Sequence, residues 1–171
     1  MDFLCEQQSD LLPREATVSS PYSIPFTELL LRESARAERY NHFFSVLVIQ
    51  TDDMDVTEAM RRTRDRLRAC DMAGILDEDG ICHRLPLQGR NSDQLPDAVP
   101  RGANLPLVVV LPETGRDGAE IVEKRIQKRL MDDGNTRVGI AIYPDDSTRP
   151  ENLLDIAREG NGKRNADRGY A

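Results

Sequence analysis

FFSVLVIQ (residues 43–50) and LPLVVVL (residues 105–111) are the two stretches that decide the fold of this chain. Both are short, rich in branched side chains and apolar almost without interruption. Such runs are typical of central strands that are covered on both faces. A sheet covered on both faces needs helices as covering layers, so the sequence predicts an α/β architecture.

Amphipathic helices are predicted around these strands. In residues 26–40, apolar and small side chains recur at helical spacing, with charges on the other face. The same pattern returns in residues 56–70 and 119–131, and a last helix begins at residues 150–158. Helices of this kind can each bury one face against the sheet.

The remaining strands form a hairpin and a final strand. Residues 72–76 and 81–85 flank the turn Asp77-Glu78-Asp79-Gly80, and residues 137–143 alternate apolar side chains. With the two opening stretches this makes five strands. The rest of the chain is predicted as a flexible N-terminal segment (1–20), one domain (21–171) and, within that domain, a loop rich in Pro, Gly, Asn and Asp (86–104).

Composition excludes several classes of function. The net charge of -7 weighs against a general nucleic-acid binder, although a local pocket lined by arginine remains open. No apolar run is long enough to span a membrane, and the N-terminus lacks the pattern of a secretory signal, so a cytoplasmic location is expected. Cys5, Cys70 and Cys82 form an odd set without metal spacing, which favours free thiols.

Three further segments are informative together. The first is Leu29-Leu30, Glu33 and RAERY (36–40) followed by FSVLVI; the second is LPETGRDGAEIVEKRI (111–126); the third is VGIAIYPDDSTRPENLLDIA (138–157). In this order, over residues 26–157, they resemble the GGDEF (diguanylate cyclase) family. The resemblance implies a single domain of the nucleotide-cyclase type, with a mixed, mainly antiparallel five-stranded sheet covered by helices.

The catalytic residues of that family are absent at the matching positions. The resemblance places Gln50 where the family has an Asp that ligates Mg²⁺, and a neutral amide is a poor ligand for a hard cation. The helix that reads guanine in the family has no counterpart. The signature Gly-Gly-(Asp/Glu)-(Asp/Glu)-Phe falls near Asp77 to Ile81, where acidic residues replace both glycines. Phosphoryl transfer depends on metal-neutralised charge, so we expect no cyclase activity and no cofactor.

An inhibitory-type ligand site of the family has matching residues. The resemblance places an Arg-x-x-Asp motif that binds cyclic di-GMP at Arg68-Ala69-Cys70-Asp71, and a second arginine of that site at Arg125. Arginine offers a planar fork of donors for a phosphate or for the Hoogsteen edge of guanine, and a carboxylate accepts from guanine N–H groups. A structural ion pair at the end of a helix is the alternative interpretation.

Other polar groups have simpler interpretations. Asp52, Asp53 and Asp55 follow a strand, where turn and capping chemistry is favoured over a cation site. The acidic turn at Asp77 to Gly80 lacks the further ligands of a calcium loop. His42 and His83 have no partner at metal spacing, and Cys82 should lie on the opposite side of a strand from His83. GNGKR (160–164) does not match a phosphate loop and is interpreted as a frayed, basic C-terminus.

Three functions remain as hypotheses. The first is an inactive signalling domain that binds cyclic di-GMP through Arg68, Asp71 and Arg125, and whose output is a change of conformation or assembly rather than a product. The second is a protein-interaction module or homodimer that docks through its first helix or the 86–104 loop and binds no nucleotide. The third is a residual nucleotidyl transferase using Asp52 and Asp79, which needs two compensating changes.

Overall fold

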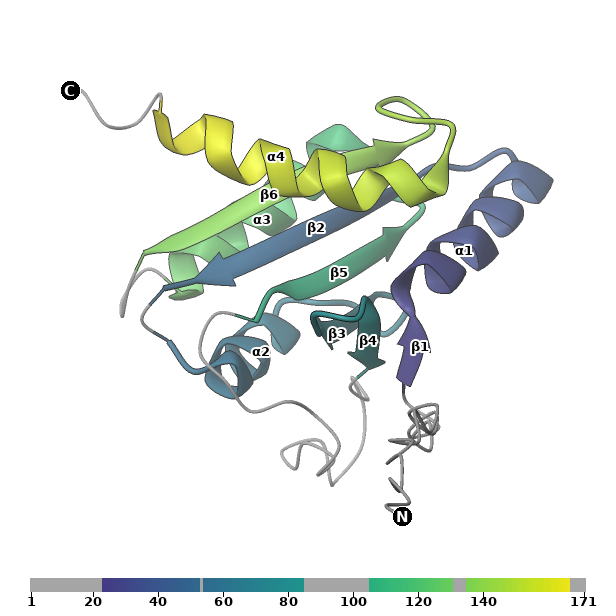
Figure 1. Cartoon of the computed structure of the whole chain (residues 1–171). Helices are drawn as coiled ribbons and strands as arrows, with labels where there is room; N and C mark the ends of the chain where they lie inside the picture. The colour runs from purple at the N-terminus through teal and green to yellow at the C-terminus, as the bar shows by residue number, and fades with distance from the viewer. Residues whose placement is uncertain (1–22, 53, 85–104, 131–134, 167–171) are drawn as a thin grey trace, which may run out of the picture.

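A computed structural model describes residues 23–52, 54–84, 105–130 and 135–166 (Figure 1). The predicted N-terminal segment and the 86–104 loop lie outside the described residues. The elements in chain order are β1 Ser23–Pro25, α1 Phe26–Tyr40, β2 Phe44–Thr51, α2 Val56–Arg64, β3 Met72–Leu76, β4 Ile81–Arg84, β5 Leu107–Pro112, α3 Arg116–Leu130, β6 Thr136–Tyr143, the short 3-10 helix η2 Pro150–Asn152 and α4 Leu153–Ala166.

One sheet holds the domain together, with strand order β1-β4-β3-β5-β2-β6. Every pairing in it is antiparallel. The five predicted strands are all present. The predicted α/β domain with one mainly antiparallel sheet covered by helices is confirmed. Among the described residues, β1 adds a sixth strand and all pairs are antiparallel, which corrects the predicted strand number and the mixed pairing.

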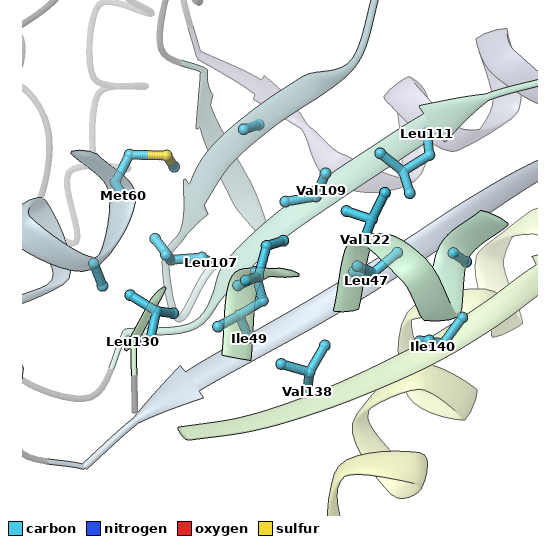
Figure 2. Packing of buried hydrophobic residues seen from close by; sticks show 14 of the residues in the cluster. Leu47, Ile49, Met60, Leu107, Val109, Leu111, Val122, Leu130, Val138 and Ile140 are labelled. Carbon is cyan, nitrogen blue, oxygen red and sulfur yellow. The ribbon is translucent and has the colours of Figure 1, made fainter. Parts of the chain in front are cut away.

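Successive side chains of the central strands point alternately into two hydrophobic cores, one on each face of the sheet. Phe44, Val46 and Val48 of β2 face α1 and α4, whereas Leu47 and Ile49 face α2 and α3. All five side chains are fully buried, which explains why the run is apolar without a polar interval. Figure 1 shows α4 lying across β6 and β2 with α3 on the far side of the sheet, and Figure 2 shows the packing under α2 and α3.

The helix boundaries differ from the prediction in three places. Helix α2 ends at Arg64 rather than at residue 70, because the chain turns there toward the buried Asp71. Helix α3 begins at Arg116, three residues earlier than predicted, with the Ala119 N–H bonded to the Gly115 carbonyl. Helix α4 continues to Ala166, so the segment predicted to be frayed is helical up to that residue.

The predicted cap of α2 is confirmed. Asp55 is the N-cap, and its Oδ1 accepts a hydrogen bond of 2.8 Å from the Thr57 backbone N–H. No helix in the described part of the chain is long and apolar enough to cross a membrane.

Candidate functional site

The Arg68 to Asp71 corner connects α2 to β3. The Asp71 N–H donates to the Arg68 carbonyl at 3.1 Å, and Asp71 Oδ2 accepts from the Arg68 N–H at 2.6 Å. The two residues therefore close the turn with a reciprocal pair of hydrogen bonds. This is local turn chemistry of the kind that Asp favours, and it fixes the backbone of Arg68.

Asp71 faces inward in this corner. Its residue exposure is only 6%, and burial raises the pKa of its carboxyl above the ordinary 3.8, while the backbone hydrogen bond and the charge of Arg68 act to lower it. The Arg68 side chain is exposed, and its guanidinium has no hydrogen bond or ion pair to any described residue. Asp71 therefore fixes the backbone of Arg68, and the exposed Arg68 guanidinium is the group that could bind a ligand.

A basic pocket lies between the end of α2 and helix α3. It has a volume of about 280 Å³ and is lined by Arg66, Arg125, Lys128 and Arg129. The structure thus brings the predicted Arg125 together with Arg66, which lies two residues before Arg68, whereas Arg68 itself does not line the pocket. Arg66 of the α2–β3 connection and the three cations of α3 therefore belong to one basic surface.

The sequence interpretation missed Arg66, Lys128 and Arg129. A signal for two of them was present, because residues 125, 128 and 129 have the i, i+3, i+4 spacing that places side chains on one face of a helix. Arg66 had no such signal, since it meets this face only through the packing of α2 against α3.

The hairpin tip between β3 and β4 is closed by its own hydrogen bonds. The Asp77 N–H donates to the Ile81 carbonyl at 3.0 Å, the Gly80 N–H to the Asp77 carbonyl at 3.2 Å, and the Ile81 N–H to Asp77 Oδ1 at 2.8 Å. The Gly80 carbonyl also accepts from the Phe26 N–H at 2.9 Å. Gly80 has a φ of 77°, which explains the glycine at this position. Three backbone N–H groups of the tip are therefore already used.

The second carboxylate oxygen of Asp77 connects the hairpin tip to β4 and, through His83, to β1. Asp77 Oδ2 lies 2.8 Å from His83 Nε2, and His83 Nδ1 lies 3.0 Å from Ser23 Oγ. With a neutral imidazole, Nε2–H donates to Asp77 and Nδ1 accepts from the Ser23 hydroxyl. Cys82, the preceding residue, is buried on the other side of the strand, as predicted. His83 thus has a structural role in the edge of the sheet.

The C-terminal end of β2 and the hairpin tip after β3 lie at the same end of the sheet. Leu107 of β5 pairs with Ile49 of β2 on one side and with Ile75 of β3 on the other. Gln50 and the residues after Ile75 therefore follow at the same height along the strands. One strand separates them, which corresponds to about 10 Å. These positions would have to cooperate in a residual nucleotidyl transferase.

The carboxylate of Asp52, at this end of the sheet, is engaged by two side chains. Its Oδ1 accepts from Arg137 at 2.6 Å, and its Oδ2 accepts from the Asn135 amide at 3.1 Å. The Arg137 contact is an ion pair. Within the described ranges, no three His, Cys, Asp or Glu side chains are grouped so that they could hold a metal ion.

Exposed apolar side chains gather along α1 and at its end. Leu31 and Tyr40 of α1 are 53% and 58% exposed, and Phe43, three residues after the helix, is 46% exposed. The other large exposed apolar side chain of the described residues is Ile121 on α3. Single exposed apolar residues are ordinary, and Leu31 and Tyr40, nine residues apart, project from opposite faces of α1.

Comparison with known proteins gives structural neighbours only. No family model matches the chain, and no curated protein matches it. A fragment of TpbB (or YfiN) from Pseudomonas aeruginosa comprising only the GGDEF domain is 20% identical, with 79% of this chain and 78% of that chain covered and a TM-score of 0.54. A sensory box/GGDEF family protein from Caulobacter crescentus is 17% identical, with coverage of 82% and 90% and a TM-score of 0.54. The chain has the fold of a GGDEF domain.

Proposed function

We propose that this GGDEF-like domain makes no cyclic dinucleotide and instead acts in signalling as a receptor for one, cyclic di-GMP. The observation that carries the first half is the closed hairpin tip. Its N–H groups at Asp77, Gly80 and Ile81 are bonded within the protein. The remaining amides of the turn belong to Glu78 and Asp79, whose own carboxylates repel a phosphate.

The end of β2 supports the same conclusion. Gln50 offers a metal ion a neutral amide, and the carboxylate of Asp52 is already engaged by Arg137 and Asn135. Incubation with GTP and Mg²⁺, followed by chromatography, tests this part. Formation of cyclic di-GMP above the level of a protein-free control would refute it.

The exposed arginines support the second half of the proposal. Arg68 presents its guanidinium from a corner that Asp71 holds in place, and Arg125 lies on the helix that packs against the same connection. Arginine forks suit the phosphodiesters and the guanine edges of this ligand. Asp71 contributes mainly by fixing Arg68, because its carboxylate is turned inward.

A titration followed by amide chemical shifts tests this binding site. Cyclic di-GMP should perturb residues of the 65–71 connection and of α3, and leave α1 unchanged. Perturbations confined to α1, or none at saturating nucleotide, would contradict the proposal. Arg39→Ala, which removes an exposed arginine from α1, is a matched control that should bind like the wild type.

A protein-interaction module is the second candidate function. The exposed Leu31, Tyr40 and Phe43 favour it, because a partner could cover exposed apolar side chains on the first helix or just after it. In this case the protein should associate through that surface with a second copy. Sedimentation velocity should show a dimer that Leu31→Ser with Phe43→Ser converts to a monomer; a wild-type protein that stays monomeric at high concentration would count against self-association.

A further inference from the structure

Four cationic side chains of the basic pocket point to a ligand of higher charge density than a phosphodiester. Arg125, Lys128 and Arg129 form one face of α3, and Arg66 comes from the connection after α2. Four positive charges that share a pocket of about 280 Å³ repel one another. A bound anion would turn this repulsion into attraction.

The lack of acidic partners makes this pocket unusual in an acidic chain. The net charge is -7, and several arginines elsewhere are paired with acids at 2.5 to 2.6 Å, as in Arg32–Glu28, Arg116–Asp146 and Arg137–Asp52. Among the described residues, none of the four cationic side chains has a hydrogen bond or ion pair. The described part of the chain therefore leaves the donors of these side chains unused.

Size and charge select the class of ligand. The pocket is open to solvent and its four lining residues are exposed, so its volume of about 280 Å³ suits a compact anionic group held by charge. Arginine forks bind phosphate oxygens in pairs, and lysine adds a compact point charge. We propose that Arg66, Arg125, Lys128 and Arg129 form a binding site for a diphosphate group, either as inorganic pyrophosphate or as the terminal group of a nucleoside diphosphate.

This site does not depend on the proposed function. It shares Arg125 with the proposed cyclic di-GMP site, so the two ligands should compete, but Arg68 and Asp71 do not line the pocket. Loss of Arg68 should therefore weaken cyclic di-GMP and spare the diphosphate. The two proposals can fail separately.

Calorimetric titration of the full chain with inorganic pyrophosphate, at 150 mM KCl without divalent cations, tests the site. We expect saturable binding at one site, with an affinity that falls as the salt concentration rises. The variant Lys128→Gln with Arg129→Gln should bind at least tenfold more weakly. The control variant Arg39→Gln with Lys124→Gln loses the same charge from exposed positions outside the pocket and should bind within twofold of the wild type.

Parallel titrations with ADP and AMP distinguish the two sources of the ligand. ADP that binds more tightly than pyrophosphate identifies a nucleotide site, and ADP that binds equally or more weakly identifies a site for the free anion; AMP should be the weakest of the three. The proposal is overturned if pyrophosphate shows no saturable binding, or if both double variants lose affinity equally, because the effect would then be one of net charge.

Discussion

Removal of the Asp77 carboxylate should open the hairpin tip. Its two oxygens accept from Ile81 N–H and from His83 Nε2, each at 2.8 Å, and the side chain is 19% exposed. Hydrogen bonds to a charged acceptor contribute about 1.5–3 kcal/mol each, and partial access of water reduces this sum. Asp77→Ala should therefore lower the free energy of unfolding by about 2–3 kcal/mol.

An isosteric variant separates the hydrogen bonds from the charge. Asp77→Asn keeps an oxygen for the Ile81 N–H, and its amide can donate to His83 Nε2 if the imidazole changes tautomer and donates from Nδ1 to Ser23. We expect a loss of about 1 kcal/mol or less for this variant. Asp79→Ala, at an exposed position of the same turn, should change stability by less than about 0.5 kcal/mol.

Urea unfolding at neutral pH, followed by circular dichroism, measures these differences. The expected order of stability is wild type and Asp79→Ala first, then Asp77→Asn, then Asp77→Ala. If Asp77→Ala unfolds within about 0.5 kcal/mol of the wild type, the carboxylate does not hold the tip closed, and the structural argument against catalysis loses its main support.

Three further predictions concern buried groups. The pKa of Asp71 is raised in the folded state. The resulting stabilisation is fully present below the unfolded pKa near 3.8 and is lost as the pH rises through the folded pKa. Asp71→Asn should therefore flatten this part of the pH profile of the urea midpoint. Burial raises the pKa of Cys82 to about 12, so in a Cys5→Ser variant a thiol reagent should label exposed Cys70 at once and Cys82 only on unfolding. Gly74→Ala places a Cβ 2.4 Å from Cys82 Sγ and should cost about 1–3 kcal/mol in unfolding free energy, part of which Cys82→Ala recovers.

The central strands could be predicted because their burial is complete. Residues 43–50 and 105–111 are apolar on both faces since a core lies on each side, and this pattern is visible without the structure. Strand β1 could not be predicted, because its three residues end in Pro25 and owe their extended form to pairing with β4. The end of α2 was also hidden, since apolar spacing continues to Leu67 and Ala69 while the turn is imposed by the burial of Asp71.

Only those contacts of the candidate site that join residues close in sequence could be predicted. Arg68 and Asp71 are near in sequence, and the structure joins them in one turn. The meeting of Arg125 with Arg66 depends on the contact between two helices and needs the fold. The closed state of the hairpin tip likewise depends on Ser23 and Phe26, which lie more than fifty residues earlier in the chain.

Calorimetric titration with cyclic di-GMP tests the central claim most directly, using the wild type, Arg68→Ala and the control Arg39→Ala. The account predicts saturable binding to the wild type and the control, and an affinity at least tenfold lower for Arg68→Ala, which corresponds to about 1.4 kcal/mol. Absence of binding to the wild type, or equal affinity for all three proteins, would contradict the proposal that this domain is a receptor for the dinucleotide.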